Sequence, residues 1–324
     1  MSFTESTYEN AVIQLFEGMG YTHIYAPDMG REDFTDPLME NVLRDALVRI
    51  NRGLPTEAIG EAMAKIRNFD GGSLIEKNRT FTEYLQNGVE VNYAVDGETR
   101  SALVRLVDFE KVENNEFAVV NQYTYIENGN NRRPDIILFV NGLPLVLMEL
   151  KSPTKEEAGV ENAYNQLRNY MQDIPSMFIY NAICVISDLS ANRAGTITSG
   201  LDRFMDWKTK DGRYENTAYA QFDTFYEGMF PKERLLDILK NFICFSGDAQ
   251  KPIKILAGYH QYFAVRKAVE KAVVATSTDG KGGVFWHTQG SGKSLTMVML
   301  AKYILMELSD CNPKVVVVTD RKEL

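Results

Sequence analysis

The spacing of apolar residues predicts helices in the first part of the chain. Residues 4–17, "TESTYENAVIQLFE", repeat apolar side chains at helical intervals after a start rich in Thr and Ser. Two more helical patterns fill residues 37–67, and the tripeptide Gly53-Leu54-Pro55 separates them. We therefore expect three helices before the first strand.

Alternation of apolar and polar residues then replaces the helical spacing. The stretches "VEVNYAV", "SALVRLVDF" and "EFAVVNQYTYI" carry β-branched or aromatic residues at every second position, which predicts a sheet. The next stretch, "RRPDIILFVNGLPLVLMELKSPT" at residues 132–154, places two apolar runs around Asn141-Gly142. That dipeptide readily adopts the positive φ angles of a tight turn, so we predict a β-hairpin that continues the sheet. A helical pattern in "EEAGVENAYNQLRNYMQDI" and the apolar strand "NAICVIS" follow.

The pattern changes again after a linker predicted at residues 246–253, "SGDAQKPI". Beyond it we expect a helix, a Gly-rich segment, a second helix and a strand in "KVVVVTD". Strand, phosphate loop, helix and strand are the opening units of a parallel nucleotide-binding sheet. The order of elements predicts an α/β protein with one domain at residues 1–248 and a second at 249–324.

Composition limits the class of protein. A chain of 324 residues with 44% hydrophobic and 24% charged residues is typical of a soluble globular protein of about two domains. No signal segment and no apolar run long enough to span a membrane is present, which predicts a cytoplasmic protein without a membrane partner. The net charge of -9 argues against a surface that binds nucleic acid everywhere, and it leaves room for a local basic groove.

Charged residues on the predicted hairpin are candidates for catalysis. Glu149 and Lys151 share one face of their strand, and pairing of the hairpin brings Asp135 beside Glu149. Two adjacent carboxylates repel unless a cation lies between them, and Mg²⁺ prefers such hard oxygen ligands. A metal there polarises a phosphodiester while Lys151 orients the attacking water or offsets negative charge. The alternative is a solvated ion pair on an edge strand that binds nothing.

Other polar residues add to this picture. Gln166 and Tyr170, four residues apart on the predicted helix, present an amide and a phenol on one face that suits a DNA backbone or a metal site. Glu9 on the opening helix is a candidate third carboxylate. Each has an ordinary alternative as an exposed amide, a tyrosine at the edge of the core and a surface charge.

The residues around the hairpin resemble the PD-(D/E)xK nuclease domain of the R subunit of type I restriction enzymes. The resemblance extends over "FTEYLQNGVEVNY", "LVDFEKVENNEFAVVNQYTY", "NAYNQLRNYMQDIPSMFIYNAICVISD" and "FMDWKT", so it covers nearly the whole chain. It implies a mixed central sheet flanked by helices. It also implies catalytic roles for Asp135, Glu149 and Lys151, with Asp135 and Glu149 as ligands of Mg²⁺.

The same resemblance extends to two further elements. The family's Q-x-x-x-Y element falls on Gln166 and Tyr170, which implies that these two residues position DNA. The glutamate of the family's early helix falls on Glu9, which implies a third metal ligand.

A phosphate-binding loop is predicted in "HTQGSGKS", residues 287–294. Gly292, Lys293 and Ser294 match the pattern G-x-x-x-x-G-K-[ST], in which backbone N–H groups and the Lys hold phosphates and the Ser or Thr binds Mg²⁺. His287 stands in place of the first glycine, a departure that resembles the loop of this family's helicase-like motors. The other loop residues expected at the nucleotide are Thr288, Gly290 and Ser291.

Two neighbouring stretches resemble further motifs of superfamily 2 helicases. "ILAGYHQYFAV" is similar to the segment whose Gln reads adenine, which implies that role for Gln261. "VVVVTDRKEL" is similar to the next motor motif. A motor of this class also needs an acidic pair and a second RecA-like lobe, and neither can be placed after Ser294. We therefore expect a truncated R subunit with a partial RecA-like P-loop motor lobe that neither hydrolyses ATP nor translocates.

The leading hypothesis is the endonuclease subunit of a type I restriction-modification system, which cleaves double-stranded DNA with Mg²⁺. The resemblance implies ATP-driven translocation in the full-length protein. It also implies assembly with methyltransferase (M) and specificity (S) subunits, through which S-adenosylmethionine enters. Two alternatives remain open. One is a non-catalytic fragment that binds DNA or the methyltransferase with a silent metal site, and the other is an ATP-binding regulator built on Lys293.

Overall fold

The computed structural model describes residues 5–95, 97–151, 159–188, 190–213, 222–247 and 252–318. The chain divides into two compact units, Met1–Leu256 and Ala257–Leu324. The division falls eight residues after the boundary expected at residue 248. At the two ends of the expected linker, β11 (Ile243–Ser246) and β12 (Ile253–Leu256) pair as antiparallel strands within the first unit.

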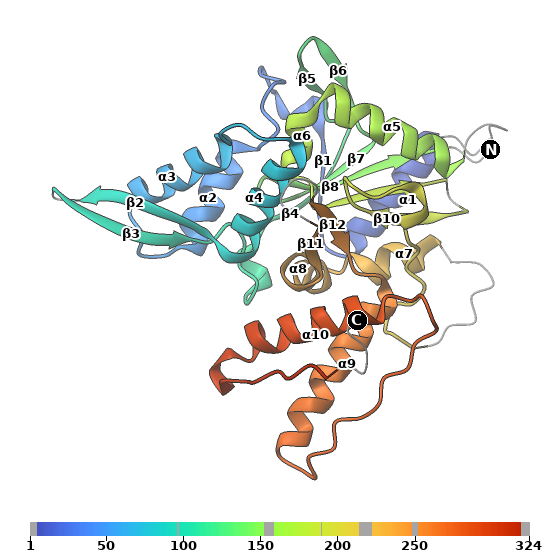
Figure 1. The fold of residues 1–324 in the computed structure, drawn as a ribbon. Helices are drawn as coiled ribbons and strands as arrows, with labels where there is room; N and C mark the ends of the chain where they lie inside the picture. The colour runs from blue at the N-terminus through green and yellow to red at the C-terminus, as the bar shows by residue number, and fades with distance from the viewer. Residues whose placement is uncertain are drawn as a thin grey trace. The chain divides into compact units, whose positions relative to one another are not determined.

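A six-stranded mixed sheet forms the centre of the first unit (Figure 1), in the order β1-β4-β7-β8-β9-β10. Its β1–β4 and β8–β9 pairs are parallel and the other neighbours are antiparallel. The strands are β1 (Thr22–Tyr25), β4 (Phe117–Asn121), β7 (Ile136–Val140), β8 (Leu143–Leu150), β9 (Ile183–Ser187) and β10 (Asn192–Gly195). All residues of β7, β8 and β9 are buried, as expected for strands covered on both faces.

Helices cover both faces of this sheet. The apolar face of α5 (Val160–Asp173) packs with Ile137, Leu147 and Ile186 in one buried cluster. On the opposite face α1 (Glu5–Gly18) lies against β1, β4 and β8. The other helices of this unit are α2 (Glu40–Ile50), α3 (Thr56–Arg67), α4 (Leu74–Asn87), α6 (Pro175–Ile179), α7 (Phe222–Met229) and α8 (Lys232–Asn241). The mixed α/β fold class with a central sheet flanked by helices is confirmed.

The first three expected helices are α1, α2 and α3, and the break at Gly53-Leu54-Pro55 is confirmed. The expected single sheet needs a correction. Strands β2 (Val89–Val95) and β3 (Glu98–Val104) pair only with each other and extend away from the central sheet beside α3 (Figure 1). Strands β5 (Tyr125–Glu127) and β6 (Asn130–Arg132) form another separate pair. Alternation predicts a strand, and it does not say which partner the strand finds.

The predicted hairpin turn is confirmed in detail. Asn141 and Gly142 have φ angles of 52° and 77°, the two positive values of a two-residue turn between β7 and β8. The Asn141 side chain is fully buried and donates hydrogen bonds to Leu106 O and Asn115 Oδ1 while it accepts one from Glu116 N. The turn is therefore anchored to the preceding loop, and this fixes the pairing of the two strands.

The second unit contains α9 (Tyr259–Thr276) and α10 (Lys293–Glu307), both expected from the sequence. The strand expected at the four valines is wrong, because Val315–Val318 adopt no strand conformation and are exposed. Residues 281–288, before the phosphate loop, are likewise not a strand. Neither stretch has a ladder partner among the described residues, and a strand without a partner leaves its backbone groups to water.

Lys254 on β12 is buried within the first unit. Its side chain is 2% exposed, and Nζ donates to Asn78 Oδ1 at 2.9 Å and to Asn181 O at 2.8 Å. Burial lowers the pKa of this amine to about 7. Because the unfolded chain holds this proton up to about pH 10, it binds more protons than the folded chain between pH 7 and 10.

We expect this difference to make the free energy of unfolding rise with pH by about 1 kcal/mol per unit from pH 7 to 9. Urea denaturation at pH 7, 8 and 9 measures the slope, and Lys254→Met should remove it. The matched control is Lys65→Met, which replaces an exposed lysine and should keep the slope. Equal pH dependence of wild type and Lys254→Met would contradict the assignment.

Candidate active site

The hairpin brings two carboxylates together at one end of the central sheet. Ile136 pairs with Met148, so Asp135, one residue earlier, lies opposite Glu149. Asp135 is half-buried, and its Oδ2 accepts a hydrogen bond of 2.7 Å from the backbone N of Leu150. This bond closes the hairpin at the end away from the turn. The Asn-Gly turn starts the pairing, and a register shift of one residue between Leu138 and Phe139 then places the two carboxylates opposite each other.

Glu149 is the most buried charged residue of the hairpin. It is 2% exposed, and Lys151 Nζ donates to its Oε1 at 2.5 Å. Such a buried carboxylate is stable only with a cation or several donors beside it. The alternative of a solvated pair on an edge strand is excluded, because β8 lies between β7 and β9 in the interior of the sheet.

Helix α5 adds a phenol and an amide to the carboxylates. Tyr170 is 6% exposed and makes hydrogen bonds with Glu149 and Gln166. Burial first, then the negative charges of Glu149 and Asp135, raise the pKa of the Tyr170 phenol well above its ordinary value. The phenol therefore stays protonated and serves as a donor to Glu149. The structure brings Asp135, Glu149, Lys151, Gln166 and Tyr170 into one group.

Glu9 stands apart from this group in its contacts. It is 9% exposed, and its carboxylate accepts hydrogen bonds from Asn121 Nδ2 at 2.6 Å and from Gln122 Nε2 at 3.1 Å. Asn121 and Gln122 were not identified from the sequence, where an Asn-Gln pair at the end of a strand gives no signal of its own. Their position beside Glu9 depends on the packing of α1 against β4.

The donor set fits a hard divalent cation. Mg²⁺ typically takes one or two carboxylates and keeps several waters, and Asp135 and Glu149 supply two carboxylates at opposed positions. Among the described residues no group of three or more His, Cys, Asp or Glu has metal-holding geometry. Glu9 is thus not gathered with Asp135 and Glu149 into a three-carboxylate cluster, and its role as a metal ligand stays a prediction.

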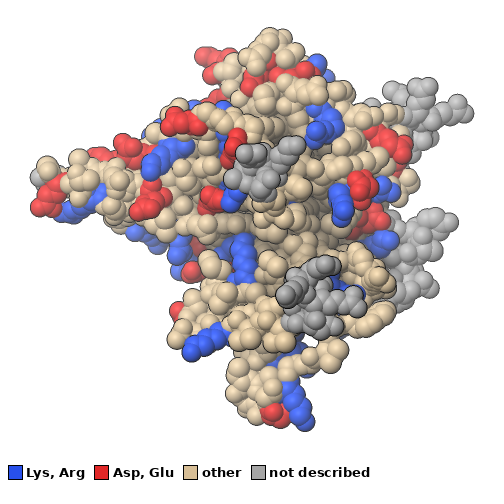
Figure 2. Space-filling view, viewed as in Figure 1, with Lys and Arg blue, Asp and Glu red and all other residues tan. Residues whose placement is uncertain are grey.

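Charged side chains of both signs surround the nuclease-like unit. On the face shown in Figure 2, Lys and Arg lie interspersed with Asp and Glu across the first unit. That distribution agrees with the net charge of -9 and shows no broad basic area among the described residues of this face. Any attraction of nucleic acid there is local rather than long-ranged.

The predicted phosphate loop lies at the start of α10. Gly290 and Gly292 have φ angles of 82° and 77°, and Gly292 caps the helix that begins at Lys293. Lys293 Nζ donates to the carbonyl oxygens of His287 at 2.8 Å and Thr288 at 3.1 Å. Ser291 Oγ also donates to Thr288 O. A glycine-rich turn that leads into a helix N-terminus, with a lysine folded over it, is the arrangement that receives phosphate groups.

Gln261 contacts this loop from α9. It is 4% exposed, its Oε1 accepts from Gly258 N, and its Nε2 donates to the carbonyls of Ser291 and Gly292 at 3.4 and 3.3 Å. In this structure its amide supports the loop, and its reading of adenine stays a prediction. Ser294 follows Lys293 in the first turn of α10 and is exposed.

A mixed sheet that presents Asp, Glu and Lys at one end, with helices on both faces, defines a PD-(D/E)xK-type nuclease domain. The comparison with protein families agrees. Residues 2–203 match the family described as type I restriction enzyme R protein N terminus, and residues 260–324 match the SWI2/SNF2 ATPase family. The chain belongs to the type I restriction enzyme R protein N-terminal family, which confirms the resemblance found in the sequence.

Curated relatives agree with this assignment. The chain is 38% identical to the type I restriction enzyme HindI endonuclease subunit of Haemophilus influenzae over 99% of its length, and this covers 32% of the relative. It is 33% identical to the putative type I restriction enzyme MjaIXP endonuclease subunit of Methanocaldococcus jannaschii over 98% of its length and 33% of the relative. The chain therefore spans about a third of these relatives. Among the described residues, no helix combines the length and the apolar character that a membrane crossing requires.

Proposed function

We propose that this chain is the nuclease portion of a type I restriction endonuclease subunit, and that it hydrolyses phosphodiester bonds of double-stranded DNA with Mg²⁺. The observation that carries the proposal is the contact group itself. Asp135 lies opposite Glu149, and Lys151 and Tyr170 both bond to Glu149. This group combines two oxygen ligands, a cation and a phenol at one end of a rigid sheet.

Each residue of the group has a distinct task. Asp135 and Glu149 would hold the cation, which when bound supplies Lewis-acid stabilisation of the phosphate and its leaving oxygen. Tyr170 donates to Glu149 and fixes the orientation of the carboxylate. Gln166 keeps the Tyr170 phenol in place and lies half-buried where a DNA backbone can approach. Lys151 orients the attacking water or offsets the charge that develops on the phosphate.

A metal titration tests the proposal directly. We expect calorimetry to detect binding of Mn²⁺, used in place of Mg²⁺, and Asp135→Asn to weaken that binding by at least about tenfold. Supercoiled plasmid should be cleaved by the wild type and left intact by this variant, while DNA binding persists. The matched control is Glu161→Gln, which removes an exposed carboxylate from α5 and should change nothing. Wild-type behaviour of Asp135→Asn in both assays would favour the non-catalytic binding module.

The wider activity belongs to the longer protein. We infer that ATP binds at Lys293 and the loop before it, where the lysine and the helix N-terminus are positioned for phosphate. We also propose ATP-driven translocation and assembly with M and S subunits that use S-adenosylmethionine, and membership of the family supports this proposal. The expected lack of ATP turnover by this chain stays a prediction, checked by steady-state ATP hydrolysis with and without DNA.

A further inference from the structure

Two amide side chains hold both oxygens of the Glu9 carboxylate. Asn121 Nδ2 donates to Oε1 at 2.6 Å, and Gln122 Nε2 donates to Oε2 at 3.1 Å. Glu9 and Asn121 are 9% and 6% exposed. A buried carboxylate held at both oxygens has its orientation fixed, which differs from the behaviour of a surface glutamate on a helix.

The Asn121 amide is itself fixed from the neighbouring strand. His23 on β1 contacts Asn121 Oδ1 through Nε2 at 3.0 Å. Because Asn121 Nδ2 donates to Glu9, its Oδ1 must be the acceptor, so His23 Nε2 carries the proton of that bond. The chain His23, Asn121, Glu9 therefore has one consistent direction of donation, which stops the amide from turning over.

Gln122 adopts a backbone conformation that L-residues rarely take. Its φ angle is 57°, although it carries a side chain, and it directly follows β4, which ends at Asn121. Such strain persists where the surroundings determine the backbone on both sides. On the N-terminal side of Gln122, Asn121 pairs with Ile136 in the central sheet. After it, Arg31 stacks on the Tyr123 ring at 3.9 Å and donates to Thr124 O at 2.8 Å.

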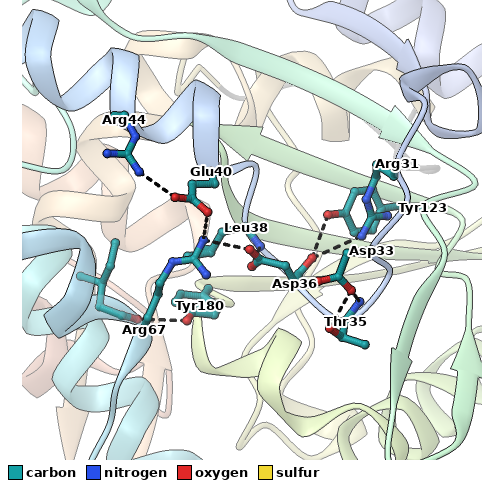
Figure 3. Close-up of polar contacts among 11 residues, drawn as sticks. Arg31, Asp33, Thr35, Asp36, Leu38, Glu40, Arg44, Arg67, Tyr123 and Tyr180 are labelled. Atoms are coloured by element: carbon teal, nitrogen blue, oxygen red, sulfur yellow. Dashed lines mark hydrogen bonds and ion pairs between the residues drawn. The ribbon is translucent and has the colours of Figure 1, made fainter. Parts of the chain in front are cut away.

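Figure 3 shows the contacts that hold the residues on the C-terminal side of Gln122. Arg31 and the Tyr123 hydroxyl both donate to Asp36 O, and the Asp36 carboxylate pairs with Arg67, which also pairs with Glu40. The segment that leads into α2 thus fixes the residues directly after Gln122. From this strained turn the Gln122 side chain donates to the carboxylate of Glu9.

This arrangement lies at the end of the sheet that carries the nuclease group. Asn121 on β4 pairs with Ile136 on β7, and Ile136 pairs with Met148 on β8. The adjacent residues Gln122, Asp135 and Glu149 therefore lie at the same end of the sheet. Helix α1 covers that end from the other face, because Tyr8, next to Glu9, bonds to Ser187, which pairs with Leu150. These two independent contacts of α1 place Glu9 at the same end of the sheet as Asp135 and Glu149.

We propose that Asn121 and Gln122 are positioning residues of the nuclease site, which hold the Glu9 carboxylate ready for the cation or its bound water. This inference rests on the proposed function and goes beyond it, since it assigns a task to two residues for which the family resemblance implied no role. In this positive-φ conformation the Gln122 amide donates to Glu9.

Gln122→Gly tests the inference, because glycine accepts a positive φ without strain while the side chain that carries the amide is removed. We expect the melting temperature to stay equal or rise, whereas the Mn²⁺ affinity of the whole chain falls about tenfold. In plasmid cleavage kcat should fall about 10 to 100-fold with KM for DNA unchanged. Gln122→Asn, which keeps an amide and tolerates positive φ, should restore part of the affinity and the rate.

The matched control is Asn128→Gly. Asn128 has a φ angle of 50° in the turn between β5 and β6, so the change relieves similar strain at a site outside the nuclease group. It should change stability as Gln122→Gly does and leave Mn²⁺ affinity and cleavage unaltered. The inference is overturned if Gln122→Gly binds Mn²⁺ and cleaves as this control does, or if its loss of activity follows a loss of stability.

Asp135→Asn separates this inference from the proposed function. If Asp135→Asn abolishes Mn²⁺ binding and Gln122→Gly does not weaken it, only the role of Gln122 and Asn121 fails. If Asp135→Asn leaves Mn²⁺ binding and cleavage unchanged, the proposed function fails and the inference fails with it. Calorimetry decides either case without requiring turnover.

Discussion

Lys151→Met is expected to lower the rate of DNA cleavage about 10³-fold, because a fixed cation at the reacting phosphate typically contributes that much. The same change removes the ammonium that lies 2.5 Å from Glu149 Oε1. Glu149 is 2% exposed, so its charge would remain in the core without that partner. Loss of one member of a buried ion pair costs about 3 kcal/mol or more. We therefore expect a variant that is unstable when metal is absent and that cleaves slowly when metal is present.

Divalent metal should restore the stability of Lys151→Met but not its rate of DNA cleavage. In the wild type Lys151 competes with a bound cation for Glu149 Oε1, whereas in Lys151→Met the cation meets an uncompensated carboxylate. Thermal denaturation with increasing Mn²⁺ should thus raise the melting temperature of Lys151→Met more than that of the wild type. An equal rise in both proteins would show that the metal does not bind at Glu149.

Lys210→Met is the control for loss of a paired lysine. Lys210 bonds to Asp223 and Glu227, which are partly exposed carboxylates away from the hairpin. We expect Lys210→Met to cost less than about 1 kcal/mol, since surface ion pairs contribute little. Its cleavage rate and its response to Mn²⁺ should match those of the wild type.

The parts of the site that the sequence predicts are those fixed by local rules. Asn141-Gly142 selects a two-residue turn, and strand periodicity then sets which residues face each other. Asp135 reaches Glu149 because that register also shifts by one residue between Leu138 and Phe139, which the sequence did not predict. Likewise the helical spacing of α5 places Gln166 and Tyr170 one turn apart, on the face that packs over the sheet. The turn and the helical spacing need only neighbours in sequence, whereas the register shift in the hairpin does not follow from them.

The remaining features depend on contacts between distant segments. Glu149 is buried because β9 and α5 cover its strand, and the sequence equally allowed an exposed pair on an edge strand. The role proposed for Asn121 and Gln122 depends on their contact with α1, which lies more than a hundred residues earlier in the chain. The stretch at 246–253 has the composition of a linker, yet it connects β11 and β12, which pair. Composition and periodicity carry no information about such partners.

Gly142→Ala is expected to destabilise the fold by about 3 kcal/mol, through the backbone of the hairpin turn. Gly142 has a φ angle of 77°, where any side chain is strained. A Cβ atom there would lie 2.6 Å from Met39 O and 3.0 Å from Leu43 N, which are backbone atoms at the start of α2. Met39 N also donates to Gly142 O at 3.0 Å, so α2 cannot move away without the loss of that bond.

Gly129→Ala isolates the steric part of this loss. Asn128-Gly129 forms the same kind of turn, with φ angles of 50° and 81°, and no atom lies within 4 Å of a Cβ at Gly129. This control carries only the strain of positive φ, about 1 kcal/mol. Urea denaturation of both variants gives the difference, which we expect to be about 2 kcal/mol. Equal losses would mean that α2 yields to the added methyl group.

The Mn²⁺ affinity of the folded Gly142→Ala protein should be unchanged if the strand register is kept, because Asp135 and Glu149 pair at the far end of the hairpin. A loss of affinity would show that the turn also sets the register of the site.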